Sequence, residues 1–232
     1  MNARAEVPVM IEGVALLQGL EKPIRERLAA EASILTVSRS DAVFRQGEAC
    51  AGLHVVIEGQ VKLLMRTGNG HEKVFEVIGP NETMGETALF LGLPYPVAAE
   101  AVVDTRLMHL AKGTLLRELA SDSMFALRVI ESLARRLNRH TEDLKSYMLL
   151  SGTQRVICFL LQEIPDVFSA TDAVEVTLPT RKGVIASKLN LTQEHFSRIL
   201  RDLTAASLIE VAGARIRIPD VARLRDYQMA QE

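Results

Sequence analysis

The sequence predicts an α+β protein built from three consecutive parts. These are an N-terminal β-roll of the jelly-roll type with helices before it, a long helix, and a C-terminal winged helix-turn-helix domain, with boundaries expected at residues 1–122, 123–150 and 151–232. Three observations support this prediction. Short β-rich runs separated by glycine turns fill residues 34–110, apolar residues keep a heptad-like spacing in the second part, and a helix-turn-helix pattern followed by a basic hairpin lies near the C-terminus.

The composition excludes several classes of protein. The 232 residues are 48% hydrophobic and 24% charged, with a formal net charge of -2, which is ordinary for a globular chain. No apolar run could span a bilayer and no secretory pattern opens the chain, so we expect a cytoplasmic protein with no membrane partner. Because the net charge does not favour nucleic acid, any DNA affinity must come from a local cluster. Cys50 and Cys158 lie far apart without metal-ligand spacing, and we expect both to be buried small apolar residues.

The first part has the sequence pattern of an antiparallel sandwich. Residues 11–32 show helical spacing, and from residue 34 to residue 109 short runs rich in β-branched residues alternate with glycine turns. Asn69-Gly70 between two such runs indicates a hairpin. We expect a short helix over residues 85–90 to cover the sheet.

A long helix is predicted over Ser123–Leu150, because apolar residues recur three and four positions apart. Such a seam favours a parallel two-helix dimer, and a helix packed on its own domain is the alternative. The predicted dimer-interface residues are Ile130, Leu133, Leu137, His140, Leu144 and Tyr147.

Residues 190–203 have the pattern of a DNA recognition helix. Thr192 suits the N-cap, and a short helix over Lys182–Leu189 is expected to precede it after a tight turn at Asn190. One face of the longer helix is apolar, at Phe196, Ile199, Leu200 and Leu203. The other face carries side chains that can read base edges in a major groove, at Gln193, Glu194, Ser197 and Arg198.

A basic hairpin follows this helix. Residues 207–211 and 214–218 have the pattern of two strands joined at Gly213, and Arg215 and Arg217 leave the second strand by one face. An amphipathic helix with a solvated charged face is the alternative for 190–203, but the hairpin, which suits a wing, favours DNA. The predicted phosphate contacts are Lys182, Lys188, Thr192, Arg201, Arg215 and Arg217.

Five motifs occur in a recognisable order. They are Phe44-Arg45-Gln46-Gly47-Glu48, Glu58-Gly59-Gln60-Val61, Gly79 with Gly85-Glu86 and Leu89-Phe90, Leu133-Ala134-Arg135-Arg136-Leu137, and Glu194-His195-Phe196-Ser197-Arg198. Together they resemble the cyclic-AMP receptor protein / fumarate-nitrate regulator (CRP/FNR) family over nearly the whole chain. The resemblance implies a homodimeric transcription regulator, not an enzyme, whose cyclic-nucleotide-binding-like roll senses an effector. The implied partners are double-stranded DNA, a second copy of the chain and RNA polymerase.

Two subgroup features refine this resemblance. The combination of Glu194, Ser197 and Arg198 is similar to the Glu-x-x-Ser-Arg of the fumarate-nitrate branch, which implies a TTGAT…ATCAA palindrome. Phe196–Ile199, Arg155-Val156 and Gly70–Lys73 resemble the dissimilatory nitrate respiration regulators (DNR). That subgroup implies a response to nitric oxide through haem, although no histidine here has a ligand motif, and a metal site stays unassigned.

Departures from the family bear on the effector. Where cyclic-AMP receptors place an Arg-Ser pair, residues 93–97 here are Leu-Pro-Tyr-Pro-Val, so no arginine can hold a cyclic phosphate, which argues against cyclic AMP. Two cysteines cannot supply the four thiolates of an iron–sulfur cluster. The effector-pocket residues that the resemblance implies are Gly85, Glu86, Tyr95, Val97, His140 and Thr141.

Functions of other classes fit less well. A cupin-like enzyme needs a His-x-His pair, whereas residues 34–110 contain only His54, His71 and His109. A cyclic-nucleotide module of a kinase or channel carries the phosphate arginine and lacks a winged helix, the reverse of this chain. No nucleophile elbow or P-loop is present.

Overall fold

The structure is a computed structural model that describes residues 3–66, 72–164 and 173–229. The chain forms two compact units, residues 1–138 and 139–232, and each is described here by itself. Among the described helices none is long and apolar enough to cross a membrane.

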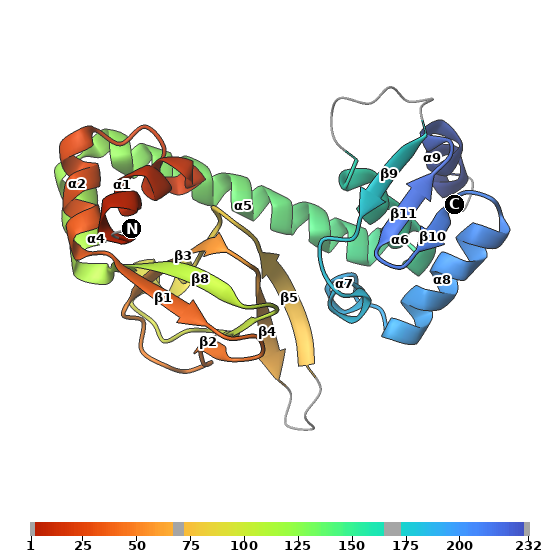
Figure 1. The fold of residues 1–232 in the computed structure, drawn as a ribbon, viewed down its shortest axis with the longest axis horizontal. Helices are drawn as coiled ribbons and strands as arrows, with labels where there is room; N and C mark the ends of the chain where they lie inside the picture. Colours follow the sequence, from red (N-terminus) through yellow and green to blue (C-terminus); the bar gives the residue numbers. More distant parts are fainter. Residues whose placement is uncertain (1–2, 67–71, 165–172, 230–232) are drawn as a thin grey trace. The chain divides into compact units, whose positions relative to one another are not determined.

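The first unit is the predicted sandwich of two antiparallel sheets (Figure 1). One has the strand order β1-β8-β3-β6 and the other the order β2-β7-β4-β5. Their bounds are β1 Ser33–Val37, β2 Ala42–Phe44, β3 Gly52–Glu58, β4 Val61–Arg66, β5 Glu72–Ile78, β6 Thr83–Met84, β7 Ala98–Ala101 and β8 Thr105–Ala111. The predicted hairpin turn at Asn69-Gly70 lies outside the described residues, but β4 and β5 on either side of it pair antiparallel.

Helices pack against one sheet of the roll, on the side of β3 and β8. The predicted N-terminal helical region is divided into α1 and α2 by a short 3-10 helix, and α4, which the sequence analysis missed, follows the last strand (Figure 1). The bounds are α1 Ala3–Gly13, η1 Ala15–Leu17, α2 Lys22–Glu31, α3 Glu86–Leu91, α4 Lys112–Ser121 and α5 Ser123–Leu149. The helix α3 is the short helix predicted over residues 85–90.

Strand β3 is buried on both faces. Leu53 and Val55 contribute to an apolar cluster with residues of α1, α2, α4 and α5, whereas Val56 contributes to the cluster between the two sheets. A strand with both faces covered needs a continuous apolar run rather than simple alternation. This explains why β3 reads Leu-His-Val-Val-Ile in the sequence.

His54 is the polar exception within that run. Its side chain is buried, with its ring 5.7 Å from Phe44 and 4.8 Å from His109, which lies directly opposite on β8. The Nδ1 atom of His54 has no hydrogen-bond partner among the residues that the structure describes. Burial, with a smaller effect of His109, lowers the pKa of His54 from 6.5 to about 4, so the ring is neutral near pH 7.

The helix α5 presents an apolar stripe that differs in part from the predicted seam. Leu133 packs on the apolar core of the first unit, and the Tyr147 hydroxyl donates a hydrogen bond of 2.5 Å to the Lys188 carbonyl oxygen. Both therefore make contacts within the chain, and His140 is half-buried, so these three are less exposed than Ile130, Leu137 and Leu144, and their place in a dimer interface stays a prediction. The exposed positions at alternating spacings of three and four are Leu127, Ile130, Ala134, Leu137, Thr141, Leu144 and Met148.

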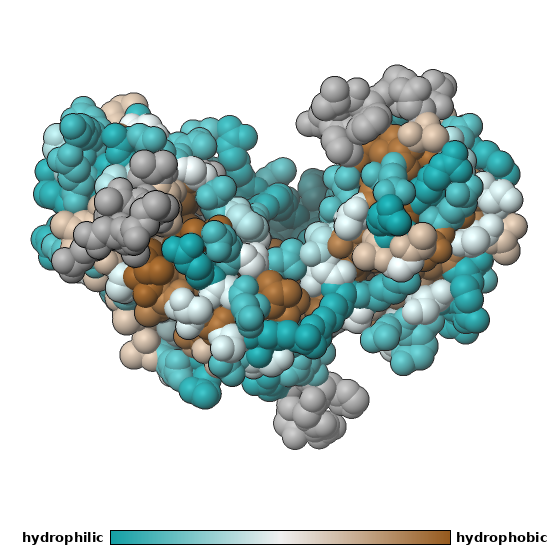
Figure 2. Space-filling model, viewed as in Figure 1, coloured by the Kyte–Doolittle hydropathy of each residue, from teal (hydrophilic) through white to brown (hydrophobic). Residues whose placement is uncertain are grey.

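Isolated apolar residues also occur elsewhere on the surface. Figure 2 shows apolar patches among the hydrophilic side chains on both units. Single exposed apolar residues are ordinary in folded proteins. The α5 stripe is distinguished by its regular spacing along one helix.

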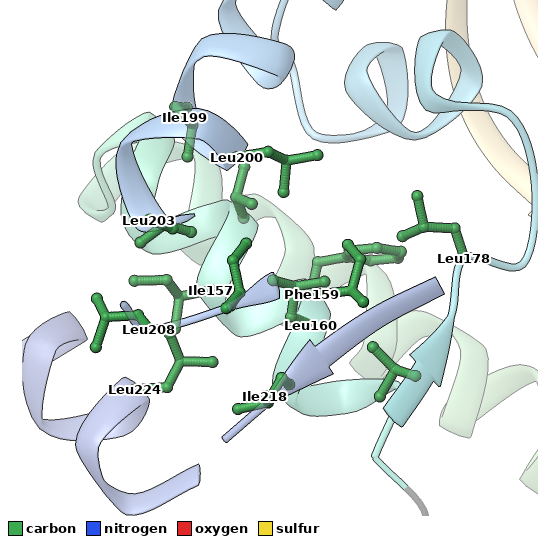
Figure 3. Close-up of a cluster of buried hydrophobic side chains, with 14 of the residues drawn as sticks. Ile157, Phe159, Leu160, Leu178, Ile199, Leu200, Leu203, Leu208, Ile218 and Leu224 are labelled. Atoms are coloured by element: carbon green, nitrogen blue, oxygen red, sulfur yellow. The ribbon is translucent and has the colours of Figure 1, made fainter. Parts of the chain in front are cut away.

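The second unit is a helical bundle on a small sheet. Its elements are α6 Gly152–Gln162, β9 Val174–Thr177, α7 Lys182–Lys188, α8 Gln193–Ala205, β10 Glu210–Ala212, β11 Arg215–Ile218 and α9 Val221–Met229. The sheet order is β10-β11-β9, and α6 begins with a capping box between Ser151 and Gln154. The sequence analysis missed α9, and the acidic loop over residues 165–172 lies outside the described residues. Apolar side chains of α6, α8, β11 and α9 point towards one another in one core (Figure 3).

We expect the roll to lose stability in acid because of His54. The unfolded chain takes up this proton near pH 6.5 while the folded chain resists it until about pH 4, so stability falls as the pH decreases through that window. Between pH 7 and pH 4.5 the loss from this group should be about 2–3 kcal/mol. Urea unfolding of the full chain and of His54→Phe should show a smaller pH dependence in the variant. His195→Gln, in the other unit, is the control, and an unchanged pH dependence in His54→Phe would contradict the assignment.

Candidate nucleic-acid interface

The helix-turn-helix consists of α7 and α8 joined by a short left-handed turn. Asn190 has a φ of 59°, the conformation expected for this turn. The N–H of Leu191 then donates to the carbonyl oxygen of Ala186 at 2.9 Å, which closes the turn onto α7. The predicted pattern is therefore present.

The start of α8 is capped as predicted. The Thr192 hydroxyl oxygen accepts from the N–H of His195 at 3.1 Å and satisfies one of the donors that the first turn leaves without an intrahelical partner. Glu194 is exposed in the first turn, where the helix dipole favours a negative charge.

One face of α8 is fully packed. Its side chains are at most 3% exposed and belong to the core of the second unit (Figure 3). They are Phe196, Ile199, Leu200 and Leu203. Because this face is buried, the rotation of α8 about its axis is determined, and the opposite face points outward.

The outward face carries the predicted base-reading groups. Glu194 and Arg198 are exposed and Ser197 is half-buried. Within the described chain no ion pair or hydrogen bond engages the carboxylate of Glu194 or the guanidinium of Arg198, so both are available to a ligand. Gln193 is exposed as well, and its side chain lies beside α7, since a Cβ on Gly183 would come within 2.7 Å of its Oε1.

The predicted phosphate contacts are in several environments. Arg201 is exposed and Lys182 is half-buried, both within the helix-turn-helix. The Thr192 hydroxyl oxygen is engaged in the cap, although its proton can still be donated. Lys188 is half-buried at the end of α7, where its own carbonyl oxygen accepts from Tyr147.

The wing arginines are paired with carboxylates of their own sheet. Arg217 Nη1 lies 2.9 Å from Glu210 Oε1, and Arg215 Nη1 lies 3.7 Å from Glu175 Oε1. All four side chains are exposed. The sequence analysis missed these acidic partners. The Gly213 turn could have revealed one of them, because it sets the register in which Glu210 lies opposite Arg217.

The roll contains a second cluster of polar groups, at the predicted effector site. Glu86 is buried at the start of α3, and its Oε1 accepts from Arg136 Nη1 of α5 at 2.8 Å and from the Thr83 hydroxyl. Arg136 Nη2 also donates to Glu76 at 2.6 Å, and Nη1 donates to the Thr83 carbonyl oxygen at 2.9 Å. Burial opposes the charged guanidinium, but the carboxylates outweigh it and raise the pKa of Arg136.

Other predicted effector residues lie nearby. Gly85 has a φ of 102°, and a Cβ there would approach the Tyr95 ring to 3.3 Å. Tyr95 stacks on Phe44 at 3.8 Å and donates to the Gly52 carbonyl oxygen at 3.3 Å, and burial raises the pKa of its hydroxyl. Val97 packs on the same cluster between the sheets.

His140 and Thr141 belong to the second unit, so their part in this site stays a prediction. Arg136 and Glu76 were missed as site residues, although Arg136 stands inside a motif that the sequence analysis had noted.

In the described ranges no three His, Cys, Asp or Glu side chains are grouped so that they could hold a metal ion. Cys50 and Cys158 are free thiols and are half-buried, not fully buried as predicted.

Comparison with known proteins agrees with both units. Residues 34–122 match the cyclic nucleotide-binding domain model and residues 154–227 match the Crp-like helix-turn-helix domain model. A CRP-like cAMP-activated global transcriptional regulator of Mycobacterium tuberculosis is 26% identical over 211 residues, which cover 90% of this chain and 94% of that protein.

Solved structures with similar folds and sequences cover nearly the whole chain. A Ruegeria pomeroyi protein named for cyclic nucleotide binding is 31% identical, covers 98% of this chain and 99% of its own, and has a TM-score of 0.64. DNR from Pseudomonas aeruginosa is 28% identical over 98% of this chain and 100% of its own, with a TM-score of 0.54.

The chain is a DNA-binding transcription regulator whose N-terminal domain is of the cyclic nucleotide-binding domain type. It belongs to the CRP/FNR family, a family of regulators and not of enzymes.

The wing pairs lead to a testable prediction. Glu210→Gln should release Arg217 and remove a negative charge beside the DNA backbone, so affinity for any duplex should rise about three- to tenfold at low salt. The slope of log K against log[salt] should steepen by about one unit. Fluorescence anisotropy over a salt series measures both. Glu131→Gln, an exposed acid paired with Arg135 in the first unit, is the charge-matched control, and equal changes in the two variants would contradict a role for the wing.

Proposed function

We propose that this protein is a homodimeric, sequence-specific regulator that reads a TTGAT…ATCAA-like palindrome under control of its roll. The observation that carries the proposal is the outward face of α8. There a carboxylate and a guanidinium that have no partner among the described residues stand one helical turn apart, at Glu194 and Arg198, over an opposite face that is completely packed.

The chemistry of this face suits the G·C pair of such a half-site. Arg198 can donate two hydrogen bonds to guanine O6 and N7, and Glu194 can accept from cytosine N4. Ser197 is a less selective partner. The basic residues around the helix would bind phosphates and determine affinity rather than sequence.

The exposed stripe of α5 supports a dimer. Leu127, Ile130, Leu137 and Leu144 are between 56% and 67% exposed, and Met148 is 75% exposed. A second copy of the same helix offers an equivalent stripe, and parallel association buries both. Two copies would place two recognition helices on one palindrome, as helix-turn-helix dimers require.

The contact from Arg136 to Glu86 gives the effector site a physical connection to the dimer helix. A ligand that binds Glu86 would compete for the guanidinium and change the contact between the roll and α5. Residues 93–97 supply no arginine for a cyclic phosphate, which supports an effector other than cyclic AMP. The family resemblance is the basis for proposing that the protein activates transcription through RNA polymerase.

A haem-dependent response to nitric oxide is a second candidate for this control, and the observation that favours it is His54. A neutral imidazole with an unpartnered nitrogen has the chemistry of an axial ligand. The ring, however, is only 6% exposed between the sheets. The residues in this arrangement therefore do not fit a haem.

Base reading by Arg198 is testable by substitution. Arg198→Ala should weaken binding to a TTGAT…ATCAA duplex by about 1–3 kcal/mol and relax the preference for guanine at one position. Arg201→Ala, on the same helix, should weaken binding to all sequences alike. Competition assays with single-base variants of the duplex measure both, and an equal loss on random DNA in Arg198→Ala would show that Arg198 binds only phosphate.

Dimerisation through α5 is testable in the same way. Leu137→Glu should raise the dimer Kd by about a hundredfold or more, because two apolar contacts are lost and two charges are introduced into the seam. Leu116→Glu, at an exposed leucine of α4 outside the stripe, is the control. Light scattering and operator binding are the readouts. A Leu137→Glu protein that stays dimeric at low micromolar concentration would contradict dimerisation through the α5 stripe.

A haem titration separates the two effector candidates. A saturable Soret band that shifts with nitric oxide and is lost in His54→Phe would support haem ligation. Specific DNA binding without haem uptake would eliminate haem and leave a small ligand of the roll.

A further inference from the structure

We propose that the DNA-binding unit has a small-molecule site of its own, for an organic monocarboxylate with an apolar body. The site is a pocket of about 380 Å³ between the end of α5, the helix α6 and the end of α7. All of its lining residues belong to the second unit, so the pocket does not depend on the placement of the roll. Its volume is within the range of small-ligand sites.

The central feature of the pocket is Arg155 of α6. Its Nε is buried and has no hydrogen-bond partner, and among the described residues its guanidinium makes no ion pair. Buried donors are almost always satisfied. A guanidinium presents parallel N–H groups that match the two oxygens of a carboxylate, so a carboxylate would satisfy Nε and balance the charge together.

The other charges of the lining limit the ligand to a single negative charge. Lys145 is already paired with Glu142 at 2.7 Å. Lys188 lies near Glu163: burial raises the pKa of that carboxyl, and the charge of Lys188 opposes part of this effect. Asp143 lines the same pocket. Asp143 opposes any anion, so the second negative charge of a phosphate or a dicarboxylate would have no unpaired cation of the described lining to balance it, whereas one carboxylate is balanced by Arg155.

The rest of the wall is apolar and would bind the body of the ligand. Leu149, Leu150, Phe159 and Leu189 contribute to it, and Cys158 lies beside them. A ligand with only a charged group would leave this surface in contact with water. An aromatic or branched aliphatic carboxylate would cover it.

The position of the pocket connects it to DNA binding. The Tyr147 hydroxyl joins α5 to the carbonyl oxygen of Lys188, and both residues line the pocket. A bound ligand would therefore touch α5, α6 and the first helix of the helix-turn-helix at once. This site is separate from the one around Glu86 in the roll.

The test uses 3-phenylpropionate as the probe and isothermal titration of the full-length protein. We expect saturable binding, weakened about ten- to hundredfold in Arg155→Met, because a charge-assisted hydrogen bond is lost. Arg225→Met, an exposed arginine of α9 outside the pocket, should bind as the unmodified protein does. The uncharged 3-phenylpropanol and inorganic phosphate should both bind more weakly than the probe.

A second measurement locates the ligand without altering the pocket. In a Cys50→Ser chain Cys158 is the remaining thiol, and the probe should slow its alkylation by N-ethylmaleimide. No saturable binding at millimolar concentration, equal binding by Arg155→Met, equal binding of phosphate, or unchanged alkylation of Cys158 would each overturn the proposal. These experiments use no DNA, so their failure would leave the proposed function unaffected.

Discussion

The packing of the apolar face of α8 into the core of the second unit is the interaction on which the DNA interface depends. Four side chains at helical spacing, Phe196, Ile199, Leu200 and Leu203, are buried together, and each contributes about 1.5–3 kcal/mol by leaving water. A rotation of the helix by one residue would expose part of this face. The same packing therefore holds Glu194 and Arg198 outward without any contact of their own, and the reading groups stay unpaired and available.

The charged side chains of α8, of the wing and of the roll differ in their exposure and in their ion pairs. On α8 the charged side chains of Glu194 and Arg198 are exposed and have no partner in the described part of the chain, which suits binding to another molecule. On the wing each arginine has a carboxylate partner in the same sheet, and such exposed pairs are weak enough for phosphate to replace them. In the roll Arg136 is enclosed with Glu76 and Glu86, where loss of one partner would leave a buried charge. The state of an arginine in these three regions therefore depends on its exposure to solvent, since the residue type is the same in all three.

The two faces of β3 explain how the roll can both support helices and fill the space between its two sheets. One face joins the helical cluster, and the other meets the second sheet beside Phe44 and Tyr95. His54 lies between the sheets, so a titratable ring is held neutral by its surroundings.

Much of the fold and of the DNA site could be predicted from local pattern, because it depends on backbone periodicity and turn chemistry. The 3.6-residue period of α8, the left-handed turn at Asn190, the Thr192 cap and the hairpin at Gly213 each depend on residues a few positions apart. Other features depend on which distant residues meet when the chain closes. Leu133 and Tyr147 share the predicted seam of α5, but the core and Lys188 engage them and move the exposed stripe to other positions. The partners of Arg136 and the pocket around Arg155 join elements far apart in the chain, and no periodicity encodes a contact of that kind.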